Sequence, residues 1–461
     1  MTNPALKNRR SRPDLGQLRE DGQHDSLYRQ AERTRLEGQF PGSFDSVGHD
    51  ACGILCKIRK TGEATHGNVV RALEELAHMA HRSGEVRGEG DGAGIQTDIP
   101  RLLWKRWYEE AQLSLESVDA PEFFVAHLFV PQGLNVREIQ DALRVTSPRY
   151  GVQVKLERVG QVYSRALGPV ARLTEPQFVQ LSGTVQGDTS RERNRQLFEL
   201  GLELEAHHPV HVVSLSTHSV VYKVRGSAEL LPRYYPDLSH PEFVSVCTIG
   251  HNRYSTNTLS TFEQVQPFSL LAHNGEINTI DRLRKEGHQL GLPLTGGSDS
   301  QDLNRVLAGH IYAQGMSLLE AIESVFPPVL SEVKSFSTSL QSAYVGLRAG
   351  GGPLAQGPAA IISRDGNECV FSVDALGLRP LWFGETEKEY FWSSERGVIP
   401  LGSMVNDPAP FAPGEKMVAC LSGGIIRLHA NEGVQRLVLE RVHQKGYNFD
   451  DAHKRVPGPH L

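Results

Sequence analysis

The feature that most constrains the fold is an alternation of short strand-like runs with helical patterns, which continues from residue 47 to about residue 428. Apolar residues that recur at three- and four-residue steps predict helices at 66–80, 136–145, 191–205, 279–290 and 301–314. Runs of β-branched or apolar residues bounded by turn residues predict strands at 123–130, 210–216, 219–224, 244–253, 343–347, 359–364, 369–373, 390–393 and 416–421. Strands and helices mixed along the whole span predict one large α+β domain, in which the neighbouring runs 210–216 and 219–224 form a strand pair.

The two ends of the chain lack this pattern. The first 45 residues contain few large apolar side chains and no sustained period, which is typical of a flexible extension. We therefore expect a flexible extension or propeptide over 1–51, the folded domain over 52–430 and a polar tail over 431–461.

Composition excludes several classes of protein. Of the 461 residues, 39% are hydrophobic and 22% are charged, and the formal net charge is −6 with no long basic stripe, so we expect no nucleic-acid partner. No run approaches 18 apolar residues and no secretory signal is present, so we expect no membrane span and a cytoplasmic location. Five cysteines in a long chain indicate reduced thiols rather than a disulfide framework.

Cys52, which precedes a glycine, is a candidate nucleophile if the chain is cut after Ala51. A free cysteine titrates near about 8.5 and a terminal α-amine near about 7.7–8.0. After such a cut the backbone amine of Cys52 could accept the proton of its own thiol, as the base of a nucleophile–base pair does. The alternative interpretation, which is common for a single cysteine, is a buried small apolar residue.

Three further segments carry side chains suited to a small zwitterionic substrate. Arg253 ends a predicted strand, and a guanidinium is a good bidentate partner for a carboxylate, although such an arginine is often only a surface charge. Asn274 and Gly275 form a turn signal, but their N–H groups could also point at one oxyanion. Asp299 could bind an ammonium group, although Asp299 or Ser300 could equally be a helix N-cap.

Other chemistries fit the sequence less well. The glycine-rich run 88–94 carries acidic residues and lacks the ending of a phosphate-binding loop. Cys52 and Cys56 have no second close pair, so no metal site is predicted, and there is no serine nucleophile elbow. No cofactor is expected.

In this order, the segments resemble the class II glutamine amidotransferase domain at the amino-terminal end of the glutamate synthase large subunit. The resemblance covers about residues 40–428. The matching motifs are His-Asp-Ala-Cys-Gly at 49–53, Met-Ala-His-Arg at 79–82, Gly-Asp-Gly-Ala-Gly at 90–94, Ser-Leu-Ser-Thr at 214–217, Val-Tyr-Lys at 221–223, Tyr-Ser-Thr-Asn-Thr at 254–258, Gln-Pro-Phe at 266–268, Leu-Ala-His-Asn-Gly-Glu-Ile-Asn-Thr at 271–279, Gly-Ser-Asp-Ser at 297–300, Asp374 with Gly-Leu-Arg-Pro at 377–380, and Ser-Glu at 394–395.

The resemblance implies a fold and a reaction. The fold is that of an amino-terminal-nucleophile hydrolase, with four layers in the order αββα. Cys52 would attack the side-chain amide of glutamine, and Asn274 and Gly275 would form the oxyanion hole. The products would be glutamate and ammonia.

The resemblance also implies a set of substrate-binding residues. Arg253 would hold the α-carboxylate of glutamine and Asp299 its α-ammonium group. Arg82 and Thr256 match further positions close to the substrate. Residues 259–262 and the short stretch between Asn278 and Gly296 depart from the usual pattern and could reshape the pocket entrance.

The fate of the ammonia is left open by the sequence. In the family's large subunit a flavin- and iron–sulfur-containing synthase region follows this domain, and no such region is present here. We therefore expect a separate flavin/iron–sulfur synthase subunit as the partner. Two alternatives are a self-contained glutaminase and a catalytically silent glutamine-sensing or regulatory domain.

Overall fold

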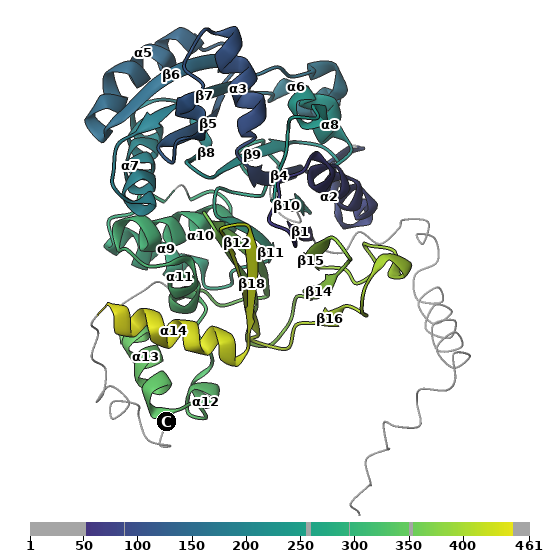
Figure 1. Ribbon diagram of the computed structural model, residues 1–461, viewed down its shortest axis with the longest axis vertical. Helices are drawn as coiled ribbons and strands as arrows, with labels where there is room; N and C mark the ends of the chain where they lie inside the picture. The colour runs from purple at the N-terminus through teal and green to yellow at the C-terminus, as the bar shows by residue number, and fades with distance from the viewer. Residues whose placement is uncertain (1–51, 87, 255–259, 295, 350–353, 446–461) are drawn as a thin grey trace, which may run out of the picture. The chain divides into compact units, whose positions relative to one another are not determined.

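The structure is a computed structural model that describes residues 52–86, 88–254, 260–294, 296–349 and 354–445 (Figure 1). The extension expected at 1–51 lies outside these ranges, as do the last 16 residues. Within the described ranges no helix is both long and apolar enough to cross a lipid bilayer.

A seven-stranded antiparallel sheet forms the first half of the central sandwich. Its strands, in spatial order, are β16 (Ala409–Pro410), β14 (Trp382–Glu385), β15 (Glu389–Ser393), β1 (Gly53–Arg59), β10 (Cys247–Asn252), β4 (Ala93–Asp98) and β9 (Ser219–Val224). β1 lies inside the sheet, because Gly53 pairs with Asn252 on one side and Leu55 pairs with Ser393 on the other. The start of β1 is therefore held in place by a strand on each side.

A five-stranded antiparallel sheet forms the second half. Its order is β11 (Leu271–Gly275), β12 (Ala359–Asp365), β13 (Glu368–Val373), β17 (Lys416–Ser422) and β18 (Ile425–Ala430). One face of each sheet contributes to a shared apolar core, which includes Ile54 and Ile249 from the first sheet and Ile362 and Phe371 from the second. The Phe371 ring stacks on Trp392 with ring centroids 3.7 Å apart, so the two sheets pack face to face.

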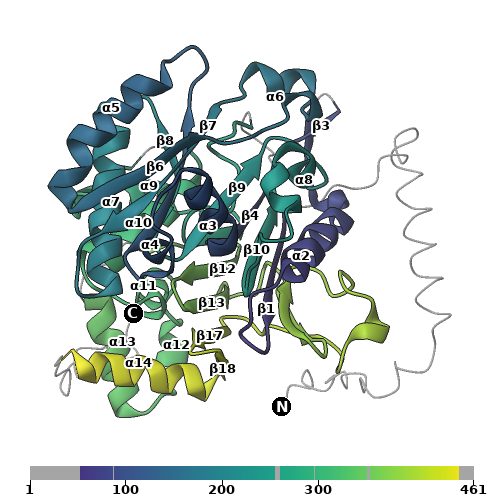
Figure 2. The same ribbon diagram turned by 45° about the horizontal axis from the view of Figure 1, so that its top comes forward.

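Helices cover the two outer faces of the sandwich (Figures 1 and 2). Helix α2 (His66–His78) packs on β1 and β10 through Val69 and Leu76, and the Thr65 side chain caps it by accepting from the Asn68 N–H. The far face of the five-stranded sheet is covered by α9 (Ile280–Gln289), α10 (Asp299–Ala308), η5 (Gly309–Ala313), α11 (Leu318–Val325), α12 (Leu330–Val333), α13 (Thr338–Ala349) and α14 (Glu432–Gln444). The predicted αββα order is thus confirmed.

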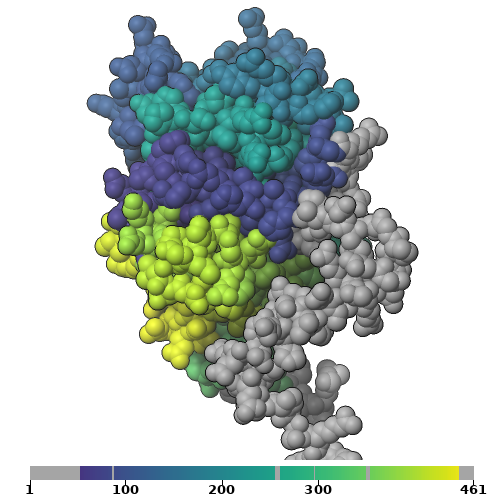
Figure 3. Space-filling view, turned by 90° about the vertical axis from the view of Figure 1, so that its right-hand side faces the viewer, coloured from purple at the N-terminus to yellow at the C-terminus, as the bar shows by residue number. Residues whose placement is uncertain are grey.

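A four-stranded sheet extends the sandwich on one side. It has the order β6 (Val152–Val159), β7 (Gln177–Val185), β5 (Phe123–Val130) and β8 (His211–Ser216), with α5 (Val136–Thr146) and α7 (Ser190–His207) packed on it. The smaller elements are η1 (Ala80–Arg82), β2 (Glu85–Val86), β3 (Glu89–Gly90), α3 (Arg101–Glu110), α4 (Glu116–Asp119), η2 (Ser147–Tyr150), η3 (Ser164–Ala166), α6 (Pro169–Leu173), α8 (Leu230–Tyr234), η4 (Pro236–Ser239) and η6 (Leu401–Ser403). On the side shown in Figure 3, the purple segment with α2 lies between the teal segments and the yellow-green strands that follow β13.

Three local predictions are wrong. The runs 210–216 and 219–224 are strands, but they do not pair: β8 pairs with β5 and β9 pairs with β4, so the chain changes sheets at Thr217 and His218. The run 343–347 lies in helix α13, where Leu340, Ala343 and Tyr344 are buried at helical spacing.

The tail expected from residue 431 is also different in the structure. Residues Glu432–Gln444 form α14, and Val434, Val438 and Val442 recur every four residues on its buried face. They pack with α13 and the outer face of the five-stranded sheet. The polar side chains between these valines hide the apolar stripe in the sequence.

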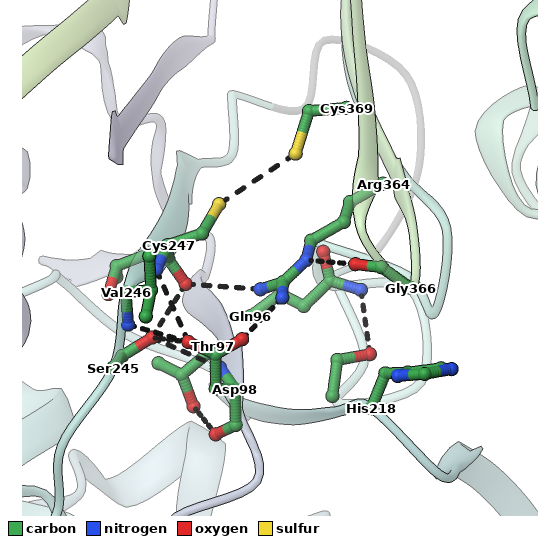
Figure 4. Close-up of polar contacts among 12 residues, drawn as sticks. Gln96, Thr97, Asp98, His218, Ser245, Val246, Cys247, Arg364, Gly366 and Cys369 are labelled. Carbon is green, nitrogen blue, oxygen red and sulfur yellow. Dashed lines mark hydrogen bonds and ion pairs between the residues drawn. The ribbon is translucent and has the colours of Figure 1, made fainter. Parts of the chain in front are cut away.

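An ion pair between a buried arginine and a partly buried aspartate joins the two sheets at the end of β1 opposite to Cys52 (Figure 4). The Arg364 guanidinium on β12 binds the carboxylate of Asp98 on β4, and its Nη1 donates to the Cys247 carbonyl at 3.3 Å. The Asp98 carboxylate also accepts from the Val246 N–H at 2.6 Å. Burial alone would raise the pKa of Asp98, but the Arg364 charge and these hydrogen bonds outweigh it and lower that pKa.

Candidate active site

Cys52 lies immediately before β1 and is half-buried. Its Sγ accepts a hydrogen bond from the Tyr254 N–H at 3.2 Å and lies 3.5 Å from the Tyr254 carbonyl. A Cβ at position 53 would lie 3.2 Å from the Arg82 Cβ and 3.5 Å from the Met79 Cβ. Glycine at 53 therefore lets the strand begin close against η1, with the thiol held at the strand's start.

The surroundings of the thiol disfavour its anionic form. Burial raises the pKa of Cys52, although the Tyr254 N–H and the charges of Arg253 and Arg379 act in the opposite direction. Both hydrogen bonds that described residues make to Sγ involve the Tyr254 backbone, so neither partner is a base. The thiol needs a base to become a nucleophile near neutral pH.

Asn274 and Gly275 form the end of β11 beside Cys52. Asn274 Nδ2 donates to the Cys52 carbonyl at 2.5 Å, across 222 positions of sequence. Asn274 and Gly275 pair with Ala360 and Ala359 of β12, so the Asn-Gly pair ends a strand and does not form a hairpin turn. Gly275 has φ of 139°, and a Cβ there would lie 1.7 Å from the Pro358 carbonyl oxygen, which excludes any side chain.

Arg253 follows β10 directly and is only 7% exposed. Its Nη1 donates to Ser260 Oγ at 2.7 Å, and Ser260 in turn donates to the Asp91 carbonyl. Burial lowers the pKa of this guanidinium, while the charges of Asp91, Cys52 and Asp299 act in the opposite direction. Arg253 is thus a buried cation within electrostatic range of the thiol.

Asp299 is the first residue of α10. Its Oδ2 accepts from the Ile277 N–H at 2.8 Å, which ties it to the chain just after Gly275. Its Oδ1 accepts from the Ser300 N–H at 2.8 Å. The N-cap is Ser298, which forms a capping box with Gln301, so the prediction of Asp299 or Ser300 as the cap is wrong.

The structure brings five predicted site residues together. The Asn274 amide donates to the Cys52 carbonyl, Gly275 follows Asn274 in the chain, and the charges of Arg253 and Asp299 both act on Cys52. Arg82 lies beside Gly53, and its Nε donates to Glu395 at 2.5 Å. Thr256 lies outside the described residues.

Other residues support the site through backbone groups, and sequence reasoning assigned them no role. The Asp374 carboxylate accepts N–H bonds from Ala359 at 3.2 Å and Leu378 at 2.9 Å, which fixes the loop before Arg379 against the end of β11. The Ser260 hydroxyl accepts a hydrogen bond from Arg253. The signals in the sequence were the motif that joins Asp374 to residues 377–380 and the departure at 259–262.

Two cavities in the described part of the chain lie elsewhere. One of about 320 Å³ is lined by Asp98, His218 and Arg364, and another of about 100 Å³ by His211 and Arg305. Cys52 lines neither cavity. Among the described residues no group of three or more His, Cys, Asp or Glu side chains is arranged to hold a metal ion.

Comparison with known proteins shows which family this sequence matches. The sequence model described as "Glutamine amidotransferases class-II" matches residues 52–441, so the match begins at Cys52. NADH glutamate synthase of Saccharomyces cerevisiae is 30% identical over 402 residues, which cover 80% of this chain and 19% of that protein. Ferredoxin-dependent glutamate synthase 2 of Synechocystis is 30% identical over 406 residues, which cover 81% and 26%.

Two further similarities were found. The NADPH glutamate synthase large chain of Bacillus subtilis is 29% identical over 396 residues, covering 79% of this chain and 25% of that one. A solved glutamine phosphoribosylpyrophosphate amidotransferase from B. subtilis, complexed with ADP and GMP, is 14% identical with a TM-score of 0.40, covering 82% and 49%. The chain thus spans between 19% and 26% of the length of the three glutamate synthases.

Proposed function

Because the chain belongs to the class II glutamine amidotransferases, which are amidohydrolases and amidotransferases, we propose that it hydrolyses the side-chain amide of glutamine to glutamate and ammonia. One observation carries the proposal. The thiol of Cys52 lies at the start of β1 beside the Asn274 amide and within range of two opposite charges, Arg253 and Asp299. A nucleophile, an oxyanion donor and a pair of charges are the groups that this reaction needs.

The nucleophile is generated by cleavage between Ala51 and Cys52. Cleavage frees the α-amine of Cys52, which titrates near about 7.7–8.0 and takes the thiol proton directly or through a water. This base is required because burial raises the pKa of the thiol and its described partners are backbone groups. The thiolate then attacks the amide carbon of glutamine.

The oxyanion formed by this attack is held by Asn274 and Gly275. Asn274 Nδ2 carries two hydrogens, so it can keep its bond to the Cys52 carbonyl and donate the second to the oxyanion. The Gly275 backbone N–H is the second donor. The amine returns its proton to the leaving nitrogen, ammonia departs, and water hydrolyses the thioester to release glutamate and the thiol.

Substrate selection rests on Arg253 and Asp299. The guanidinium binds the α-carboxylate of glutamine and the Asp299 carboxylate binds its α-ammonium group. Arg253 is buried, so a ligand that leaves it without a carboxylate forfeits the compensation for a desolvated charge. Arg82, beside Gly53, and Thr256 belong to the same proposed binding region.

The ammonia is proposed to pass to a separate synthase-type partner in the cytoplasm. Support comes from the similarity to glutamate synthases, which are several times longer than this chain. Hydrolysis without an acceptor and glutamine sensing without turnover are the competing functions.

Glutamine turnover by the purified protein tests the proposal. We expect equimolar glutamate and ammonia from the wild-type protein, no turnover from Cys52→Ala, and labelling of Cys52 alone by a glutamine-like electrophile. Cys420→Ala is the matched control, because Cys420 on β17 is also partly exposed but has no role in the reaction. Turnover that survives in Cys52→Ala would end the proposal, and a processed wild-type protein that binds glutamine without turnover would favour the sensing function.

A further inference from the structure

Lys223 is a fully buried lysine that the proposed mechanism does not use. It lies on β9 in the motif at 221–223 and is 0% exposed. Its Nζ donates to the Glu263 carbonyl at 2.8 Å and lies 3.2 Å from His211 Nε2. Burial lowers its pKa to about 7, although the charges of Glu263 and Glu205 act in the opposite direction. Lysines are rarely buried completely unless they are paired, so the position of Lys223 needs a reason.

A series of partly buried side chains leads from Lys223 across the fold. His211 Nδ1 on β8 lies 3.3 Å from the Glu205 carboxylate of α7, and that carboxylate binds Arg305 on α10. If His211 donates from Nδ1 to Glu205, its Nε2 is left to accept from Lys223. Among the described residues, the ammonium also faces the rings of Phe268 at 5.1 Å and Phe129 at 5.9 Å, and the Arg253 charge lowers the Lys223 pKa. This series of contacts links the seven-stranded sheet, the four-stranded sheet and α10.

The Glu263 carbonyl belongs to a segment that contacts both Arg253 and the start of α10, which carries Asp299. It receives a second hydrogen bond from Gln301 Nε2 at 3.1 Å, and Gln301 closes the capping box at the start of α10, next to Asp299. Three residues earlier in the same segment, Ser260 accepts from Arg253. Residues 260–264 therefore connect Arg253, which is proposed to bind the α-carboxylate, with Asp299, which is proposed to bind the α-ammonium group.

We propose that Lys223 is a positioning residue of the glutamine site, which holds the Glu263 carbonyl and thereby fixes residues 260–264 between Arg253 and Asp299. The inference rests on the proposed function, since it assumes that these two residues bind the α-groups. Its first consequence is a change in affinity with little change in the chemical step. Loss of the Lys223 ammonium should raise KM for glutamine and leave kcat nearly unchanged.

The second consequence is a dependence on pH. A charged ammonium makes a stronger hydrogen bond to a carbonyl than a neutral amine does. Protonated Lys223 should therefore hold the segment best, and affinity should fall as pH rises through about 7, where Lys223 loses its proton. The dissociation constant of glutamate, which carries the same α-groups, reports this step without turnover.

The test is calorimetric titration of glutamate into the full processed protein between pH 6 and 8.5, on the order of one titration per half unit of pH across the Lys223 transition. The variants are Lys223→Met, Lys223→Arg and Gln301→Leu. Lys57→Met is the matched control, because Lys57 is a buried lysine of the same sheet that pairs with Glu75 and Glu389 away from the site. We expect binding about tenfold weaker in Lys223→Met and no step near pH 7. Lys223→Arg should recover part of the affinity.

Each outcome decides one question. Wild-type protein that binds neither glutamate nor glutamine overturns the proposed function and this inference with it. Binding by the wild type with unchanged affinity and pH dependence in Lys223→Met overturns the inference alone. If Lys223→Met does not fold, Gln301→Leu removes the other donor to the Glu263 carbonyl, and an unchanged affinity there also overturns it. Lys57→Met should lower Tm and leave the dissociation constant unchanged.

Discussion

Gly275→Ala is the substitution whose effect follows most directly from the structure. A Cβ at 275 would lie 1.7 Å from the Pro358 carbonyl oxygen, about half of a normal contact distance, and 3.2 Å from the Ala359 Cα. The φ of 139° is also one that alanine avoids. β11 must therefore move away from β12 at the end that carries Asn274 and the Gly275 N–H. Strain of this kind costs about 1–3 kcal/mol in stability, and a misplaced oxyanion donor costs about 10²–10³ in kcat.

Two assays on the processed protein separate these effects. Glutamate release gives kcat and KM for glutamine, and thermal unfolding gives the change in stability. Gly133→Ala is the control, since Gly133 has φ of 88° but a Cβ there meets nothing within 4 Å. The control should lose a similar amount of backbone stability and keep its kcat. A Gly275→Ala protein that folds and has a kcat within about twofold of the wild type would refute the placement of the oxyanion hole.

Three further outcomes are expected. N-acetylglutamine should have a far lower kcat/KM than glutamine, and equal values for the two substrates would remove the role of Asp299. Arg253→Lys should raise KM for glutamine because the bidentate fork of the guanidinium is lost. Asp98→Asn should reduce the free energy of unfolding at neutral pH by about 3 kcal/mol, measured with denaturant. The pKa of Asp98 is lowered in the folded protein, so the ionised carboxylate stabilises the fold above its unfolded pKa of about 3.9. This stabilisation is lost as pH falls through the folded pKa, so Asp98→Asn should lose less stability on acidification than the wild type. Val438→Ala should cost about 1–3 kcal/mol, because Val438 is 0% exposed in α14, and an unchanged Tm would show that this helix does not stabilise the domain.

The sequence predicted those strands and helices whose ends are marked by nearby turn residues. The apolar run at β5 gave its bounds, Phe123–Val130, because turn residues flank it on both sides. The run 343–347 was misread since a short apolar segment can be a strand or one face of a helix, and only the neighbouring Leu340 completes the helical face of α13. The pairing of β8 and β9 with different sheets depends on long-range packing that no local pattern contains.

The candidate site was predictable only through the order of its motifs. Cys52 and Asn274 are 222 positions apart, and nothing local in either segment indicates that they meet. Asp374 and Ser260 stand in segments that the motif comparison singled out, but their roles were not predicted, because they act on backbone groups or on another side chain. Lys223 was noticed as part of a motif, but its contact with the Glu263 carbonyl depends on the folded chain.

The identity of the first residue in active protein decides whether Cys52 acts as an amino-terminal nucleophile. Intact mass spectrometry of the purified protein, together with glutamine turnover of the same sample, shows which species is active. We predict a chain that begins at Cys52, a free α-amine, and activity proportional to the processed fraction. A fully active preparation whose chain begins at Met1 would contradict this prediction, because Cys52 would then be acting without the base on which the proposed mechanism depends.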